Sequence, residues 1–250
     1  MRHRIGFWAA AAVLCVLSPV AVRAATPSGT QISAAAEAQY RSDSQTVMPK
    51  ATSNTITITV SYPAGISIGD AKTLPDGQFL ELAPNVVTAG TAQMGGVFYI
   101  EAYDRSAGIR VSTDRTVDER DEVTVWGILA TIGGERQVTA SEIVLNSVGN
   151  LLPEPLGLAP TSFGSGIDSA GLLLKLWGRL TQPGSGYFYL DGSALTHSAS
   201  ATILVHGVPP ADSLDKFVSV TGICGVEIPS TQPVPVIRTR GPSDIILMGP

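Results

Sequence analysis

Two short segments of the chain carry side chains suited to binding a ligand, and they resemble each other. Val97–Glu101 reads VFYIE and Tyr187–Asp191 reads YFYLD. Alternate side chains of a β-strand point to opposite faces, which places Tyr99 on one face of the first strand and Tyr187 and Tyr189 together on one face of the second. Tyrosine rings on such faces would stack on bases or sugar rings, each stacked base contributing about 1–3 kcal/mol. The residue types therefore indicate recognition of a ligand rather than bond cleavage.

Residue sets for catalysis are incomplete. His206, Ser213 and Asp215 supply the side chains of a hydrolytic triad, but no serine lies within a G-x-S-x-G turn. Glu101 and Asp104 would form a carboxylate pair for acid–base chemistry, yet the matching acid of the second segment has no clear partner. An acid at a strand end is typical of a residue that shapes the following turn. We therefore expect no enzymatic activity and no catalytic residue.

Metal and cofactor sites find no support in the sequence. The chain has two cysteines, and Cys15 lies in a segment expected to be removed, which leaves Cys224 without a disulfide partner. We expect Cys224 to be a buried apolar residue, with a reactive or intermolecular thiol as the alternative. His197 and His206 lack zinc-ligand spacing. The acidic segment 114–121 lacks the order of a calcium loop, and neither a phosphate loop nor a dinucleotide fingerprint occurs, so we expect no metal and no cofactor.

The N-terminus is typical of a secretory signal peptide. Arg2 and Arg4 precede the apolar run Phe7–Leu17, and Val22–Ala24 offers a cleavage site with small residues. Loss of this segment leaves 13 basic against 21 acidic residues, a net charge of −8. Such a chain lacks the broad basic surface of a protein that binds the backbone of nucleic acids. We expect a secreted, periplasmic or cell-surface protein that does not span a membrane once the signal is removed.

Two strand-like segments, Gln31–Tyr40 and Thr55–Tyr62, follow the signal. Ile56, Ile58 and Val60 alternate with hydroxyl-bearing residues, the pattern of a half-buried strand. The stretch ATSNTITITV resembles the closing strands of Ig-like repeats in bacterial surface proteins. A single hairpin buries too little surface to form a core of its own. We interpret it as a vestige, as an arm that packs on the next domain, or as a partly mobile extension.

The remainder of the chain is a duplication. Five strand-like segments follow one another in the same order in residues 78–146 and 172–247, and the V-x-V-x-G pattern of Val123–Gly127 returns at Val218–Gly222. The last strands are expected over 137–145 and 236–247, where 243–247 matches 141–145, and Ile132–Glu135 predicts a hairpin turn. A hydrophobic content of 44%, a charged content of 15%, 26 glycines and 17 prolines favour a β-rich, turn-rich protein. The predicted divisions are a signal peptide (1–24), a β-hairpin arm (25–63), a connector (64–77), a first barrel (78–147), a packed linker (148–171) and a second barrel (172–250).

Both repeats resemble the OB-fold. The shared pattern is a bent first strand, G-x-F-Y-[IL]-[DE], a small turn, I-x-V and D-x-V-x-V-x-G. It is most similar to the nucleic-acid-binding OB-fold superfamily of the tRNA-anticodon and helicase type, with relatives in exported bacterial proteins. The resemblance implies a mostly β protein with two tandem five-stranded OB-like barrels behind the hairpin arm. OB-folds host oligonucleotide, oligosaccharide and protein ligands, so the resemblance does not choose among them.

The resemblance also implies where a ligand would lie, because OB-folds bind across strands two and three and the adjoining loops. Carried onto this sequence, that face holds Tyr99, Glu101 and Arg110 in the first repeat and Tyr187, Tyr189 and Asp191 in the second. The best candidates for small basic patches are Arg105 and Arg110 with Arg136, and Arg179 with Arg238 and Arg240, although ordinary solvated surface charge also explains these residues. The alternative for the tyrosines is that they cover the barrel against the linker, the arm or the other barrel.

The leading hypothesis is an exported, non-catalytic binding module that uses its OB-fold faces. Single-stranded nucleic acid is the first ligand class to test and oligosaccharide the next. The alternative is a structural or protein–protein interaction module of the cell envelope, whose barrel faces pack on partners. A nucleic-acid binder predicts exposed tyrosines and a positive patch, a sugar binder predicts exposed tyrosines flanked by carboxylates, and an interaction module predicts an exposed apolar surface.

Overall fold

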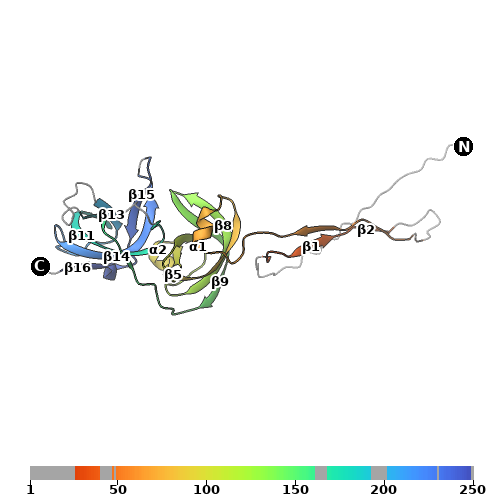
Figure 1. Ribbon diagram of the computed structural model, residues 1–250, viewed down its shortest axis with the longest axis horizontal. Coiled ribbons are helices and arrows are strands. Elements are labelled where there is room, and N and C mark those ends of the chain that lie inside the picture. Colours follow the sequence, from red (N-terminus) through yellow and green to blue (C-terminus); the bar gives the residue numbers. More distant parts are fainter. Residues whose placement is uncertain are drawn as a thin grey trace.

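The computed structural model describes residues 26–39, 47, 49–160, 168–192, 202–229 and 231–248 of the chain. The expected signal peptide, residues 1–24, lies outside these residues, so it stays a prediction. No helix within the described ranges is long and apolar enough to cross a membrane. The described chain is mostly β, as predicted, and forms a two-stranded ribbon followed by two barrels that lie side by side (Figure 1).

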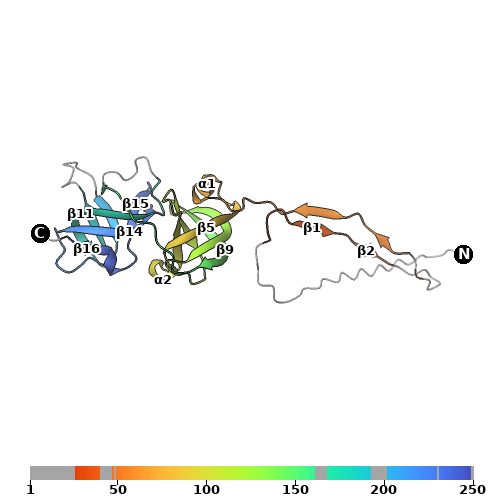
Figure 2. The same ribbon diagram turned by 60° about the horizontal axis from the view of Figure 1, so that its bottom comes forward.

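Four short strands form the projecting ribbon at the N-terminal end of the described chain. β1 (Gln31–Ala34) pairs antiparallel with β4 (Ile56–Thr59), and β2 (Glu37–Ala38) pairs antiparallel with β3 (Ala51–Thr52). Every residue of these strands is exposed. Figures 1 and 2 show the ribbon extending from barrel 1 on the side away from barrel 2. The ribbon therefore does not pack across either barrel.

Barrel 1 is closed and contains five strands in the order β5-β6-β7-β9-β8. β7 and β9 pair parallel, and the other neighbours pair antiparallel. Two helices accompany it, α1 (Ile68–Thr73) before β5 and α2 (Thr91–Met94) between β5 and β6. The strands are β5 (Phe79–Ala89), β6 (Val97–Glu101), β7 (Gly108–Ser112), β8 (Glu122–Ile132) and β9 (Glu135–Ser147).

Barrel 2 repeats this arrangement in the order β11-β12-β13-β15-β14, and β14 pairs back to β11. β13 and β15 pair parallel, as β7 and β9 do in barrel 1. β10 (Leu156–Gly157) pairs with β11, and β16 (Ile245–Leu247) pairs with β14. The five repeated strands are β11 (Leu173–Gly184), β12 (Tyr187–Asp191), β13 (Thr202–His206), β14 (Phe217–Glu227) and β15 (Val234–Arg238).

The alternation of apolar residues explains how each barrel fills its core. Phe98 and Ile100 lie in the core of barrel 1, and Phe188 and Leu190 lie in the core of barrel 2. The repeated glycines Gly127 and Gly222 lie where two strands approach closely, because a Cβ on Gly127 would overlap the backbone of β9 and a Cβ on Gly222 would overlap that of β15. The V-x-V-x-G pattern thus marks the same crowded position in both barrels.

The last strand of the second repeat differs from the prediction. A single strand was expected over 236–247, by analogy with the continuous β9. Instead β15 ends at Arg238, and a 3-10 turn over Pro242–Asp244 separates it from β16. Pro242 has no backbone N–H to continue the strand pairing. The described part of the linker packs on barrel 2, since Leu156 and Leu158 contact its core and β10 extends its sheet.

Candidate functional site

The predicted ligand face of barrel 1 is covered by barrel 2. Tyr99 is 1% exposed, and its ring lies in an apolar cluster with Ala89 of its own barrel and with Leu173 and Ile223 of barrel 2. We call this contact between the barrels the junction. Of the two interpretations given to Tyr99, packing against the other barrel is the one observed, so its ring is not available for stacking on a ligand in this conformation.

A buried carboxylate organises the polar part of the junction. The Tyr99 hydroxyl donates to Oε1 of Glu135 over 2.9 Å, and Nη1 of Arg238 lies 3.4 Å from the same hydroxyl. The side chain of Glu135 is 2% exposed, and its Oε2 lies 3.5 Å from Arg238 and 3.7 Å from Arg110. Burial, reinforced by the nearby carboxylate, raises the pKa of Tyr99, so the phenol remains a proton donor.

This network continues into barrel 2. Nη2 of Arg238 donates to Oε1 of Glu227 over 3.0 Å, and Nε2 of His206 lies 2.9 Å from the same oxygen. Arg238 therefore contacts one carboxylate from each barrel, which makes it the main charged link across this part of the junction. The result is a chain of alternating charges rather than a free positive surface.

Glu101 is also buried in the junction. It has no exposed surface, and its Oε2 accepts a hydrogen bond of 2.7 Å from the backbone N–H of Leu173. Its Oε1 has no hydrogen-bond partner among the described residues. Burial raises the pKa of Glu101 to about 7, while the hydrogen bond from Leu173 and the positive charge of Arg105 act in the opposite direction.

Two further contacts hold the barrels together. Nη1 of Arg240 lies 2.8 Å from Glu119 of barrel 1, while the rest of its guanidinium contacts Asp244. Lys72 of α1 donates to the carbonyl of Ala170 over 2.7 Å and to Asp168 over 3.0 Å. These cations are committed to protein partners, so they do not form an anion-binding patch.

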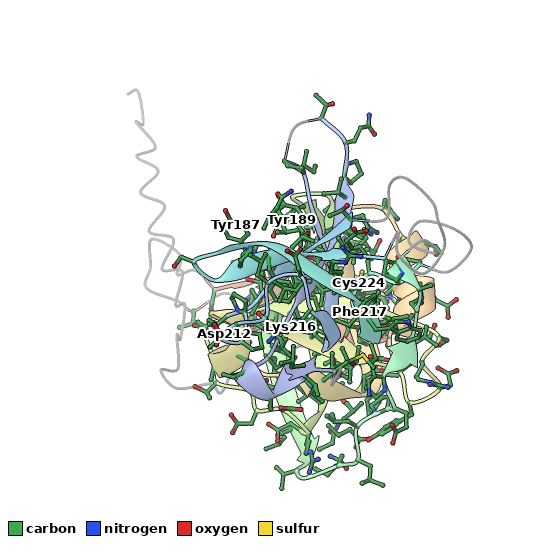
Figure 3. All side chains as sticks on the ribbon, turned by 90° about the vertical axis from the view of Figure 1, so that its left-hand side faces the viewer. Tyr187, Tyr189, Asp212, Lys216, Phe217 and Cys224 are labelled. Carbon is green, nitrogen blue, oxygen red and sulfur yellow. The ribbon has the colours of Figure 1, made fainter. Side chains whose placement is uncertain are left out.

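The matching face of barrel 2 is open. Tyr189 occupies the place in β12 that Tyr99 occupies in β6, and Tyr187 next to it is 42% exposed. The two rings meet edge to face with their centroids 6.3 Å apart, and Figure 3 shows them together on one strand. Asp191 pairs in register with Arg179, and Tyr189 with Leu204. Of the two predicted faces, barrel 2 alone therefore has an exposed tyrosine, Tyr187, with the half-buried Tyr189 beside it.

The three arginines of the predicted patch at 105, 110 and 136 each have different partners in the structure. Arg136 contacts Asp76 and the carbonyl of Leu74, and Arg105 contacts the carbonyl of Glu154. Arg110 instead faces a cleft of about 340 Å³ between the two barrels. That cleft is lined by the β8–β9 and β14–β15 turns, with Arg110, Ile132, Gly133, Val226, Glu227, Ile228, Pro229 and Arg238.

The serine and the histidine of the candidate triad have separate partners in the structure. Ser213 donates to the carbonyl of Pro210, whereas His206 lies beside Glu227. No group of three histidine, cysteine or acidic side chains in the described ranges is arranged to hold a metal ion. The prediction for Cys224 is confirmed, because its thiol is buried and burial raises its pKa to about 11.

Sequence reasoning missed the residues that build the junction. Glu135 was noted only as the end of a glycine turn, and Arg238 and Arg240 only as a basic cluster. The residues next to Glu135 in the sequence do not indicate that it is buried, since its burial depends on the second barrel. Comparison of this chain with models of protein families and with curated proteins gave no match.

Proposed function

We propose that this chain is an exported, non-catalytic interaction module of the cell envelope, built from two OB-like barrels and a projecting ribbon. Two copies of one five-stranded arrangement, each with a parallel pairing of its third and fifth strands, support the OB-like assignment. The use of the first barrel's strand-two and strand-three face to bind another barrel supports a protein-binding role for this fold.

The exposed apolar face of the ribbon is the observation that carries this proposal. Ile32 pairs in register with Ile58, and Ala34 pairs with Ile56, so these four side chains share one face. The three isoleucines are 53%, 64% and 62% exposed in the order Ile32, Ile58, Ile56. A two-stranded ribbon is marginally stable by itself and gains stability when this face is covered. The ribbon is therefore suited to bind an apolar surface of similar size.

The partner we propose for the ribbon is a second copy of this chain. Within the described part of the ribbon the charged residues are Glu37 and Lys50, which pair with each other, so no net charge opposes the approach of a copy. The opposite face is polar, and the hydroxyls of Ser33 and Thr57 hydrogen-bond over 2.8 Å. One apolar and one polar face allow two ribbons to pack symmetrically through the isoleucines.

Self-association tests this proposal directly. Sedimentation velocity of the mature chain (25–250) between about 1 and 100 μM should show a monomer converting to a dimer. Replacing Ile56 and Ile58 together with threonine, which keeps β-propensity while removing the apolar surface, should abolish the dimer. The matched control is Ile246→Thr, because Ile246 is an exposed isoleucine of β16 in barrel 2. A wild-type chain that stays monomeric throughout, or a dimer that survives the double substitution, contradicts the proposal.

A second candidate function is ligand binding on the open face of barrel 2. Tyr187 and Tyr189 support it, because Tyr187 is exposed and Tyr189 half-buried on the strand that pairs Asp191 with Arg179. Both oligosaccharide and single-stranded nucleic acid would use the rings for stacking. Arg110, Arg136 and Arg238 are paired with acidic side chains, and the chain has a net negative charge. Both features favour oligosaccharide over nucleic acid, because binding of a neutral sugar needs no cation to neutralise phosphates.

Fluorescence anisotropy with labelled single-stranded DNA, RNA and oligosaccharides across a salt series separates these ligands. Nucleic-acid affinity should fall with rising salt, by a logarithmic slope of about 0.7 per neutralised phosphate, whereas sugar affinity should stay nearly constant. Tyr189→Ala should remove either kind of binding. Tyr103→Ala is the matched control, because Tyr103 is an exposed tyrosine of barrel 1. No binding of any probe at low salt leaves the ribbon as the remaining interaction surface.

A further inference from the structure

We propose that Glu101 is a pH-sensitive latch between the two barrels: its protonated carboxyl group supports the junction, and its ionisation weakens it. This inference is independent of what the ribbon or the open face of barrel 2 binds. It concerns a contact within one chain that joins the last residue of β6 to the first residue of β11.

The carboxyl group of Glu101 lies in the buried part of the junction. Glu101 is fully buried, and Leu173, its hydrogen-bond donor across the junction, is 1% exposed. Beside them Gly108 of β7 meets Gly171 backbone to backbone, so closely that a Cβ on either glycine would overlap the other residue. Oε1 of Glu101 has no hydrogen-bond partner among the described residues. The carboxyl group is thus held by one backbone N–H from the opposite barrel.

The charged groups near Glu101 do not neutralise it by contact. On its own side, Arg105 in the β6–β7 turn is exposed and directs a guanidinium nitrogen to the carbonyl of Glu154. On the side of barrel 2, Asp168 is paired with Lys72 of α1, and Cys224 carries a buried neutral thiol. An ionised Glu101 therefore loses its hydration without gaining an ion pair, which disfavours the charged form.

The pKa of Glu101 with the barrels together and apart decides whether rising pH stabilises or weakens the junction. With the barrels together, burial raises the pKa of Glu101 from 4.5 to about 7; with the barrels apart, the carboxyl group is solvated and returns to its ordinary range. The closed junction therefore binds this proton more tightly than the open one. The contribution of Glu101 to the stability of the junction is fully present below the ordinary pKa of a glutamate. It is lost as the pH rises through the raised pKa of the buried carboxyl group. The closing constant should fall up to about 300-fold across this range.

The second repeat provides an internal comparison. Asp191 occupies the place in β12 that Glu101 occupies in β6, but it is half-buried on the open face of barrel 2. The two acids share a position in the sequence repeat and differ in whether another barrel covers them. The raised pKa of Glu101 follows from its burial beneath barrel 2.

Hydrogen exchange at the Leu173 amide tests the latch, because this N–H is the donor to Glu101. After correction for the intrinsic rate, its protection should fall up to about 75-fold between pH 5 and 8.5, since part of the full change already lies below pH 5. Glu101→Gln should make the protection independent of pH, since the amide still accepts the hydrogen bond but does not ionise. The matched control Glu154→Gln, at an exposed acid, should behave as the wild type. A pH-independent wild type, or an unchanged pH dependence in Glu101→Gln, overturns the proposal.

A second measurement needs no variant and so does not depend on whether Glu101→Gln folds. Carbon-13 labelling of glutamate side chains allows the carboxyl groups of the wild-type chain to be titrated by nuclear magnetic resonance. The carboxyl of Glu101 should titrate near pH 7, well above its ordinary value of 4.5. The Leu173 amide signal should shift with the same midpoint. A titration of Glu101 at its ordinary value overturns the latch.

Discussion

Replacing Tyr99 with phenylalanine removes one hydroxyl and tests how the buried Glu135 is stabilised. The hydroxyl donates to Oε1 of Glu135 over 2.9 Å, and the 2% exposure of that side chain means that water does not replace the lost donor. A hydrogen bond to a charged group contributes about 1.5–3 kcal/mol to stability. Because Arg110 and Arg238 remain near Oε2, we expect a value near the middle of this range, about 2 kcal/mol.

Urea unfolding at 25 °C and pH 7.5 provides the assay, with the loss taken from the midpoint at an unchanged slope. In a domain of this size a loss of about 2 kcal/mol corresponds to a fall in Tm of about 4–8 °C. Tyr187→Phe is the matched control, since its ring is exposed on barrel 2, and it should change stability by less than about 0.5 kcal/mol. If both substitutions have the same small effect, Glu135 does not depend on Tyr99 and our description of the network is wrong.

Three further predictions concern the junction and the buried thiol. Gly108→Ala should destabilise the protein by about 1–3 kcal/mol in urea unfolding, because the new methyl group overlaps the backbone of Gly171; Gly157→Ala, whose Cβ would have its nearest neighbour at 3.9 Å, should be nearly neutral. Arg240→Met leaves two acidic partners without their cation and should lower the free energy of unfolding by about 3 kcal/mol, so a loss below 1 kcal/mol would contradict its role. The Cys224 thiol, with its pKa raised to about 11, should react with a disulfide reagent at pH 8 at least about 100-fold more slowly in the native chain than in urea.

The barrels themselves were predictable because their determinants are local. Alternation in Val97–Glu101 and Tyr187–Asp191 directs one set of side chains to a core, and the structure has strands over these same residues. The glycines at 133 and 134 have positive φ angles of 62° and 84°, as a tight hairpin turn requires, and the turn lies where it was predicted. A repeated pattern of strands and turns is readable without knowing what any strand packs against.

The same reasoning predicted the site less well than it predicted the barrels. Five of the site's eight residues have partners far along the chain: Tyr99 contacts Leu173 and Ile223, Glu101 binds Leu173, Arg105 contacts the carbonyl of Glu154, and Arg110 and Arg136 pair with acids of other segments. No periodicity encodes such contacts. The split between β15 and β16 was also missed, because the similarity of 243–247 to 141–145 concealed the break at Pro242.

By itself the sequence determined the duplication, the strands, the tight turns and the buried character of Cys224, since each depends on the chemistry of neighbouring residues along the chain. Only the tertiary structure decided which of two equivalent faces is open. Tyr99 and Tyr189 occupy the same place in matching strands, and the first is covered whereas the second lies on the open face. The difference arises because barrel 2 docks on barrel 1 through Leu173, Ile223 and Arg238. That docking also converts Glu101 from an ordinary strand-end acid into a buried group with a raised pKa.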